Sequence, residues 1–320
     1  MAERFRLLQI SDLHVAETSY LSEGGRPYLR RFGFQKLVEK RFRPAHLTLL
    51  NAVARAAYRN RPLDAILITG DLANWGDAPS LQAAYGFVAS EPAHQWHDAA
   101  KLPTLRGSKV PVHLLPGNHD RFARWGYGGA GGILFDERFG AYWKVRQSVS
   151  FFTLRDSFGV VMGDLTLASV SDSTSLHGAW GQGKAYVERI AFMKVQTELL
   201  RARHKDIAII WAVHFAPAFD GLPEYLELID HGHLIAAAEE LGIHHILCGH
   251  THEQRLYPVG NGGSIKVYCA GSAAVKEEPR KTLHLFEIEV DRGSFSRFDL
   301  DILEFDEVDG FLERKPDELR

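Results

Sequence analysis

Cysteine is scarce in this chain, and long apolar runs are missing. Only Cys248 and Cys269 occur among 320 residues, which excludes a disulfide framework. Both lie in apolar, strand-like stretches, so we expect buried free thiols in a reducing compartment. No stretch approaches the roughly 20 apolar residues that span a bilayer, and the N-terminal stretch lacks the apolar core of a secretory signal. These absences predict a cytoplasmic protein with no transmembrane segment.

A strong excess of charge is missing as well. The sequence has 37 Lys and Arg against 40 Asp and Glu, a formal net charge of −3. This balance gives no global attraction to nucleic acid or to an anionic membrane, so we expect no nucleic-acid partner. The hydrophobic content of 45 % is ordinary for a globular protein. Nothing in the sequence fixes the oligomeric state, which leaves a homo-oligomer open.

Five short apolar runs, each followed at once by polar residues, organise the chain. Their length and their Ile, Val and Leu content are typical of strands buried on both faces. The runs are 5–14, 64–71, 110–120, 206–217 and 244–252. Helical patterns lie between several of them, at 46–60, 81–90, 186–203 and 234–242. The alternation of strand and helix predicts an α/β layered fold.

The C-terminal part has a different pattern. Residues 255–272 are typical of a hairpin around an Asn-Gly-Gly turn. Residues 282–291 and 295–305 alternate apolar and polar positions, as half-buried antiparallel strands do. We expect these strands to form a second sheet packed on the first layer. The sequence therefore predicts one domain over residues 1–305, followed by a charged surface segment over 306–320.

Residues able to bind a metal follow every one of the five predicted strands. They are Asp12, His14, Asp71, Asn118, His119, His214, His250 and His252. If the strands share one parallel sheet, these side chains converge at one edge, outside the carboxyl ends of the strands. Imidazole with carboxylate suits zinc, iron or manganese, and the absence of thiolate argues against a structural zinc site. The donors exceed the needs of one ion, which favours a two-metal site that acts on phosphate esters.

The order of these blocks resembles that of a known family. The blocks “DLH”, “GD”, “GNHD”, “H” and “GHTH” are similar to those of the calcineurin-like metallophosphoesterase superfamily. The short first block and the overall length are most similar to its class III cyclic nucleotide phosphodiesterase branch. The resemblance covers roughly residues 5–305. It implies an α/β fold in which two mixed β-sheets pack as a sandwich flanked by helices.

The resemblance also implies a role for each residue. The first metal would be held by Asp12, His14 and His252. The second metal would be held by Asn118, His214 and His250. Asp71 would bridge the two ions, and a metal-bridging hydroxide would be the nucleophile. His119 would face the substrate as a general acid, or as a charge that stabilises the leaving oxygen.

One position departs from part of the family. Phosphoprotein phosphatases and many phosphodiesterases carry an aspartate three residues after the bridging one, where this chain has Asn74. An amide can orient His119, but it brings no negative charge to raise the pKa of that histidine. Asp120 is a candidate to substitute, and we count it with His119 as a catalytic residue. The longer, arginine-bearing block of phosphoprotein phosphatases is missing, which argues against a protein phosphatase.

The sequence thus predicts a dinuclear phosphodiesterase for a small phosphodiester of the cyclic nucleotide or glycerophosphodiester type. We expect manganese, iron or both as the metals, with zinc as a further option. The alternatives are a phosphomonoesterase, a non-catalytic metal-binding scaffold, and a lipid-headgroup hydrolase that docks on membranes through the basic segment 26–43. The Gly-rich segment 125–132 follows “GNHD”, so Trp125 and Tyr127 are placed to stack on a flat part of the substrate, as is Trp75.

Overall fold

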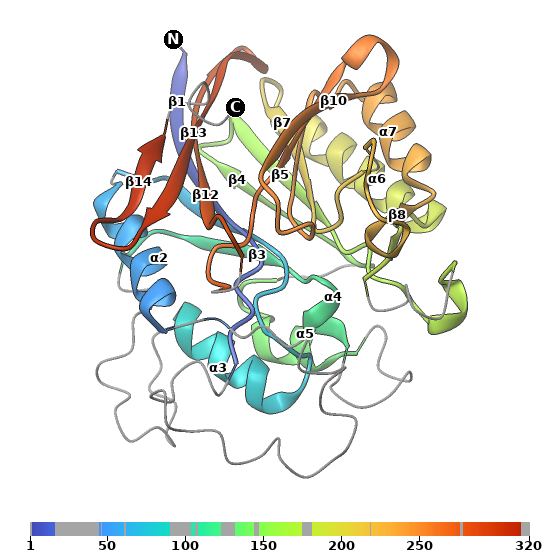
Figure 1. Ribbon diagram of the computed structural model, residues 1–320. Coiled ribbons are helices and arrows are strands. Elements are labelled where there is room, and N and C mark those ends of the chain that lie inside the picture. Colours follow the sequence, from blue (N-terminus) through green and yellow to red (C-terminus); the bar gives the residue numbers. More distant parts are fainter. Residues whose placement is uncertain are drawn as a thin grey trace.

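Two six-stranded sheets account for most of the strands in the computed structural model of the chain (Figure 1). The structure describes residues 2–16, 45, 47–60, 62–89, 104, 105, 108–122, 132–143, 147–174, 181–217, 219–275 and 278–314. The first sheet contains β1 (Glu3–Ile10), β2 (Ala65–Thr69), β3 (Val112–Leu115), β12 (Thr282–Asp291), β13 (Ser294–Asp306) and β14 (Gly310–Arg314). The second sheet contains β4 (Val149–Leu154), β5 (Phe158–Gly163), β7 (Ala208–Val213), β9 (His245–Cys248), β10 (Arg255–Val259) and β11 (Ile265–Cys269).

Short elements and helices complete the described part. A two-stranded sheet pairs β6 (Gly183–Lys184) with β8 (Leu228–Ile229). The α-helices are α2 (Leu47–Arg59), α3 (Ala78–Ala89), α4 (Asn118–Arg121), α5 (Leu134–Phe139), α6 (Val187–Arg203) and α7 (His231–Glu240). The 3-10 helices are η5 (Val170–Asp172), η6 (Glu224–Leu226) and η7 (Asn261–Gly263). The four predicted helices are confirmed, with ends that differ by a few residues.

Both sheets are mixed, as the family resemblance implied. In the first sheet β1, β2 and β3 run parallel, while β12, β13 and β14 continue from β1 as antiparallel strands. In the second sheet β5, β7, β9 and β11 run parallel, and β4 and β10 lie antiparallel at the two edges. The predicted fold class, two mixed sheets with flanking helices, is confirmed.

The distribution of strands between the sheets differs from the expected one. The first three apolar runs form β1, β2 and β3, whereas the last two form β7 and β9 of the second sheet. The predicted C-terminal strands are divided in the same way, because the hairpin β10–β11 joins β9, and β12 and β13 join β1. A run buried on both faces has the same composition in either sheet, so the pattern carries no signal for its partner strand.

The main hydrophobic core lies between the two sheets and extends beneath α2 and α3. Phe5 of β1 contacts Phe158 of β5 with ring centroids 5.5 Å apart. His245 of β9 stacks on Phe298 of β13 at 3.9 Å, which adds a second contact between the sheets. A separate apolar cluster packs the second sheet against α6 and α7. Figure 1 shows α2 beside β14 on one side of the molecule and α6 with α7 on the other.

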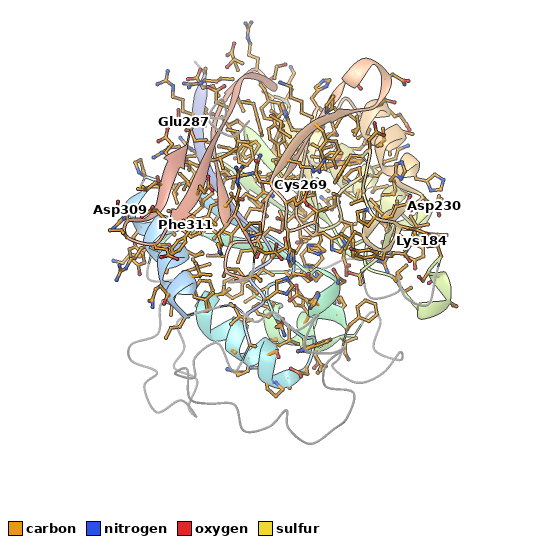
Figure 2. All side chains as sticks on the ribbon, viewed as in Figure 1. Lys184, Asp230, Cys269, Glu287, Asp309 and Phe311 are labelled. Carbon is orange, nitrogen blue, oxygen red and sulfur yellow. The ribbon has the colours of Figure 1, made fainter. Side chains whose placement is uncertain are left out.

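The C-terminal residues contribute to the first sheet. β14 pairs with β13, and Phe311 on β14 is buried against the core (Figure 2). Part of the surface segment expected at 306–320 is therefore a strand, while residues 315–320 lie outside the described ones. The apolar residues of this strand are the adjacent pair Phe311 and Leu312, a signal too short to stand out. The division into a domain at 1–305 and a segment at 306–320 stays a prediction.

Two expectations about composition can be compared with the structure. Cys248 and Cys269 are buried free thiols, as predicted. Within the described ranges no helix combines the length and the apolar character needed to cross a membrane. The cytoplasmic location and the homo-oligomer stay predictions.

Candidate metal centre

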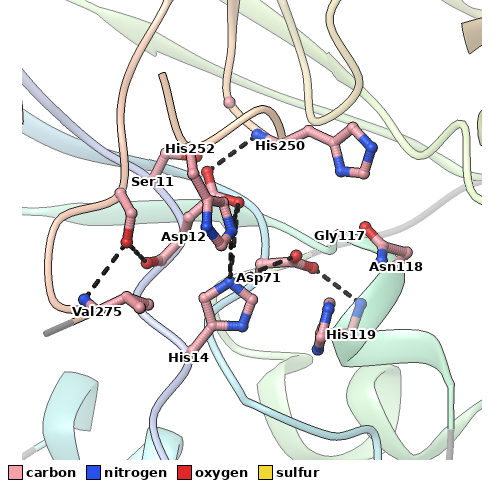
Figure 3. Close-up of polar contacts among 12 residues, drawn as sticks. Ser11, Asp12, His14, Asp71, Gly117, Asn118, His119, His250, His252 and Val275 are labelled. Carbon is pink, nitrogen blue, oxygen red and sulfur yellow. Dashed lines mark hydrogen bonds and ion pairs between the residues drawn. The ribbon is translucent and has the colours of Figure 1, made fainter. Parts of the chain in front are cut away.

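The predicted metal-binding residues come together where the strand ends of the two sheets meet (Figure 3). The first sheet supplies Asp12, His14, Asp71, Asn118 and His119, and the second supplies His214, His250 and His252. Donor atoms within 4.8 Å of one another form three groups: Asp12–His14–His252, His14–Asp71–His119 and Asp71–His214–His250. The site therefore draws its residues from both sheets, not from one sheet edge as we first considered.

The first group combines a carboxylate with two imidazoles. Nε2 of His14 lies 3.0 Å from Nε2 of His252, which in turn lies 3.5 Å from Oδ1 of Asp12. Oδ2 of Asp12 accepts the backbone N–H of His250 at 2.9 Å. Oδ1 is buried and has no hydrogen-bond partner among the described residues. This oxygen and the two facing nitrogens are thus within reach of a single ion.

The second group lies on the other side of Asp71. Nε2 of His214 is 3.2 Å from Nδ1 of His250 and 3.1 Å from Oδ1 of Asn118. Nδ1 of His214 donates to the backbone carbonyl of Thr69 at 2.8 Å. That bond fixes the tautomer, so that Nε2 of the neutral ring keeps a lone pair for a metal.

Asp71 connects the two groups. Its Oδ1 accepts the backbone N–H of His119 at 2.8 Å, which fixes the carboxylate. Its Oδ2 lies 3.4 Å from Nε2 of His214 and 3.8 Å from Nε2 of His14. A single oxygen atom is therefore placed between a ligand of each group.

The donor chemistry fits divalent metal ions. In each group two imidazole nitrogens face each other, at 3.0 Å for His14 with His252 and 3.2 Å for His214 with His250. Lone pairs this close repel unless a proton or a cation lies between the rings. Imidazole and carboxylate together suit manganese, iron and zinc, and they do not choose among the three.

Positive charge is required by the buried carboxylates. Burial would lower the pKa of His214, but the Asp71 carboxylate outweighs it and raises this pKa to about 9. Burial of His252 is likewise outweighed by the neighbouring carboxylates of Asp12 and Glu278, which raise its pKa to about 10. In the metal-free chain, protons on these two rings supply charge that bound ions would supply instead.

The backbone at the site is strained. Five of the eight residues have positive φ: Asp12 (52°), His14 (51°), Asp71 (50°), His250 (75°) and His252 (59°). This left-handed conformation costs about 1–2 kcal/mol for a residue with a Cβ atom. Such residues gather at functional sites because the surrounding contacts hold them against their local preference.

The glycines that precede Asp71, Asn118 and His250 serve two different purposes. Gly70 forms a sharp turn, with φ of +99°. Gly117 has an ordinary φ of −103°, and a Cβ atom there would overlap the carboxylate of Asp71. A Cβ atom at Gly249 would overlap the hydroxyl of Ser11 and lie 2.6 Å from Oδ2 of Asp12. The last two glycines therefore make room for neighbouring side chains, the carboxylates among them, and are not needed for a turn.

His119 lies beside both groups and is held by the main chain. Its Nδ1 donates to the backbone carbonyl of Asn74 at 2.9 Å. Its ring lies 4.5 Å from that of His14 and 5.9 Å from that of Trp75. The amide of Asn74 is buried and has no hydrogen-bond partner in the described part of the chain. The carbonyl of Asn74 thus makes the contact that we considered for its side chain.

Asp120 makes its hydrogen bonds to the main chain and not to His119. Its carboxylate accepts backbone N–H groups from Leu72 at 3.1 Å, Ala73 at 2.7 Å and Gly117 at 2.9 Å. These bonds tie the loop after β2 to the loop after β3. The structure therefore gives this carboxylate a structural function in place of the pairing with His119 that the sequence suggested, and a catalytic role for it stays a prediction.

Two supporting contacts were not predicted from the sequence. Oε1 of Glu278 lies 3.1 Å from Nδ1 of His252, a carboxylate–imidazole pair that is typical of metal sites. Arg121, at the end of α4, makes two hydrogen bonds to Asp136 at 2.8 and 2.9 Å and one to Asp164 at 3.0 Å. These pairs join residues distant in sequence, and no local pattern marks them.

Several predicted substrate contacts lie outside the described residues. They are the basic segment 26–43 and residues 125–131 of the Gly-rich segment, with Trp125 and Tyr127. Of the aromatic residues proposed to stack on substrate, Trp75 is described, and its ring is buried near His119.

Known proteins resemble this chain in sequence or in fold. The family model of the calcineurin-like phosphoesterases matches residues 5–254. No curated protein matches the chain. Among solved structures, a dimetal phosphatase from Danio rerio is similar at 13 % identity and a TM-score of 0.54, over 92 % of this chain and 98 % of that one. The sulfate thiohydrolase SoxB from Thermus thermophilus has 15 % identity and a TM-score of 0.47, over 93 % of this chain and 56 % of that one.

The structural likeness at such low identity supports the fold alone. The family model covers most of the chain and spans every strand end that carries a candidate ligand. The chain belongs to the calcineurin-like phosphoesterase family.

Proposed function

We propose that this chain is a two-metal phosphodiesterase that hydrolyses a small phosphodiester of the cyclic nucleotide or glycerophosphodiester type. The observation that carries the proposal is the position of Asp71, whose Oδ2 lies 3.4 Å from His214 and 3.8 Å from His14. A carboxylate oxygen between two sets of imidazoles is suited to bridge two ions. The preference for a diester rests on the sequence resemblance to the class III cyclic nucleotide phosphodiesterase branch.

The assignment of ligands follows the two groups. The first ion would be held by Asp12, His14 and His252, and the second by Asn118, His214 and His250. Asp71 would be shared. Two such ions lower the pKa of water and neutralise charge that develops on the phosphoryl oxygens. Manganese, iron or both fit these ligands, as does zinc.

Side chains and backbone groups orient the ligand rings, and His119 can supply a proton. Thr69 and Glu278 hold the rings of His214 and His252 through their Nδ1 atoms, so that both rings keep a fixed orientation. The ring of His119 is held through Nδ1, which leaves Nε2 for the substrate. When protonated, Nε2 can donate its proton to the leaving alkoxide oxygen as a general acid.

The test is a pair of assays on one preparation. Chelator-treated protein would be given Mn²⁺, Fe²⁺ or Zn²⁺ in turn and assayed with bis(p-nitrophenyl) phosphate and p-nitrophenyl phosphate. We expect metal-dependent cleavage that is faster with the diester and is weakened in His119→Ala. The matched control is His244→Ala, which changes an exposed histidine whose Nδ1 donates to the carbonyl of Ser264.

The other outcomes separate the alternatives. Faster cleavage of the monoester would identify a phosphomonoesterase. Two bound ions without turnover of either ester would favour a non-catalytic scaffold. Faster turnover of a diester in anionic vesicles than in free solution would favour the lipid-headgroup hydrolase.

A further inference from the structure

A buried polar bridge crosses between the two sheets just before the strand ends that carry the ligands. Gln9 interrupts the apolar run of β1 and is fully buried. Its Nε2 donates to the backbone carbonyl of Cys248 in β9 at 2.9 Å and to Oγ1 of Thr69 in β2 at 3.1 Å. The first bond joins the first sheet to the second, and the second bond joins neighbouring parts of the first sheet.

The three residues of this bridge stand close to the ligands in sequence. Gln9, Thr69 and Cys248 lie two or three residues before Asp12, Asp71 and His250, respectively. Thr69 also accepts the hydrogen bond from Nδ1 of His214 at 2.8 Å through its backbone carbonyl. The bridge therefore fixes the backbone from which ligands of both groups project.

The buried amide of Gln9 lies between the two sheets, where an apolar side chain would be expected. Burying an amide in an apolar core is unfavourable unless it is hydrogen-bonded, and an apolar residue would fill the same space. Both ends of Gln9 are paired, since its Oε1 accepts from Nδ1 of His284 in β12 at 3.1 Å. Hydrophobic contacts between sheets are non-directional, whereas a hydrogen bond has a preferred length and angle. The amide of Gln9 can therefore set the offset between the sheets.

We propose that Gln9 is a positioning residue of the metal centre, which holds the two sheets at the offset where ligands from both reach the same ions. The inference rests on the proposed two-metal site, because only a site that draws on both sheets is sensitive to their offset. A shift of about 1 Å is enough to loosen such a site.

The test measures metal affinity independently of activity. Gln9→Met removes the amide and keeps the length of the side chain. Mn²⁺ binding to the chelator-treated full-length chain would be measured by equilibrium dialysis. We expect affinity to fall by about 10-fold, the lower end of the effect of outer partners on metal binding. Gln9→Leu, which also removes the amide that bonds to Cys248, should act in the same direction and serves if Gln9→Met does not fold.

Two controls separate positioning from stability. Leu8→Ala creates a cavity on the opposite face of the same strand. It should lower Tm and leave Mn²⁺ affinity unchanged. His284→Phe removes the partner of Gln9 within the first sheet and should likewise leave Mn²⁺ affinity within about twofold, because the bonds to Thr69 and Cys248 remain.

Three results would overturn the inference. Wild-type Mn²⁺ affinity in both Gln9→Met and Gln9→Leu would reject the role of Gln9. Equal loss of affinity in Leu8→Ala, at the same loss of Tm, would show a general effect of stability. Fewer than two Mn²⁺ per wild-type chain would reject the two-metal site itself, and the inference with it, so the two failures are distinguishable.

Discussion

Asp71 and His214 meet across the two sheets, with Oδ2 of the carboxylate 3.4 Å from Nε2 of the imidazole. Asp71 follows β2 of the first sheet, and His214 follows β7 of the second. Neither sheet alone carries both groups of candidate ligands. The metal centre is therefore a property of the packed sandwich, and perturbations of the packing should act on metal binding.

Replacing Asp71 by asparagine removes the charge that the two groups share. We expect Asp71→Asn to retain at most one Mn²⁺ per chain and to lose about 100-fold or more in kcat. Residues that only hydrogen-bond to metal ligands already change metal affinity or activity by about 10–100-fold. Metal content after dialysis and the diester assay measure the two effects. Asp156→Asn, at a carboxylate that is 77 % exposed, is the control. Two tightly held ions in Asp71→Asn would contradict the assignment.

Gly117→Ala tests whether this glycine is needed for space. Its φ of −103° suits alanine, so the backbone is no obstacle, but the added Cβ would overlap the carboxylate of Asp71. We expect a folded chain, by circular dichroism, whose Mn²⁺ affinity falls by about 10-fold or more. Gly232→Ala in α7 is the matched control, because a Cβ there meets nothing within 4 Å. Unchanged Mn²⁺ binding in Gly117→Ala would show that Asp71 has room to move.

Glu278→Gln removes the negative charge that His252 meets at Nδ1. The change makes the imidazole less basic and its orientation less fixed, so we expect one of two ions to bind about 10–100-fold more weakly while the other is unaffected. Isothermal titration with Mn²⁺ resolves the two sites. Glu253→Gln, in the loop that carries His252 and paired with Arg255, should behave as wild type. A uniform loss at both sites would argue against a contact specific to His252.

His284 makes stability depend on pH. Burial lowers its pKa from 6.5 to about 3, so the unfolded chain takes up a proton that the folded chain does not. Stability is therefore lost as pH falls below 6.5, by about 1.4 kcal/mol per pH unit until the folded pKa is reached. Urea unfolding of metal-free protein at pH 7, 6 and 5 should show a shallower decline for His284→Gln by about this amount. Parallel declines would mean that His284 is protonated in the folded state.

The candidate ligands could be predicted because each closely follows a recognisable strand in the sequence. Asp12, Asp71 and His214 follow apolar runs that have few structural alternatives. The sheet to which each run belongs could not be predicted, because β2 and β7 are both short buried runs and the sequence marks no partner. The hairpin β4–β5 was also missed, since its turn at 155–157 lacks the Asn-Gly pair that marked the β10–β11 hairpin.

The contacts that support the ligands are harder to predict from sequence. Thr69 reaches His214 through a backbone carbonyl across 145 positions, and Asn74 reaches His119 through a carbonyl across 45. Any residue type has a carbonyl, so its identity gives no signal. The contacts of Asp120 were equally hidden, because its position beside His119 does not indicate that its carboxylate accepts three backbone N–H groups.

The central claim is that two ions share Asp71 between ligands of both sheets. Electron paramagnetic resonance of the Mn²⁺-loaded chain tests it most directly, because two Mn²⁺ ions with a common carboxylate are magnetically coupled. We predict two Mn²⁺ per wild-type chain with the signal of a coupled pair, and loss of the coupling in Asp71→Asn. Two ions that give only the signal of isolated Mn²⁺, or a coupled pair that persists in Asp71→Asn, would contradict the account.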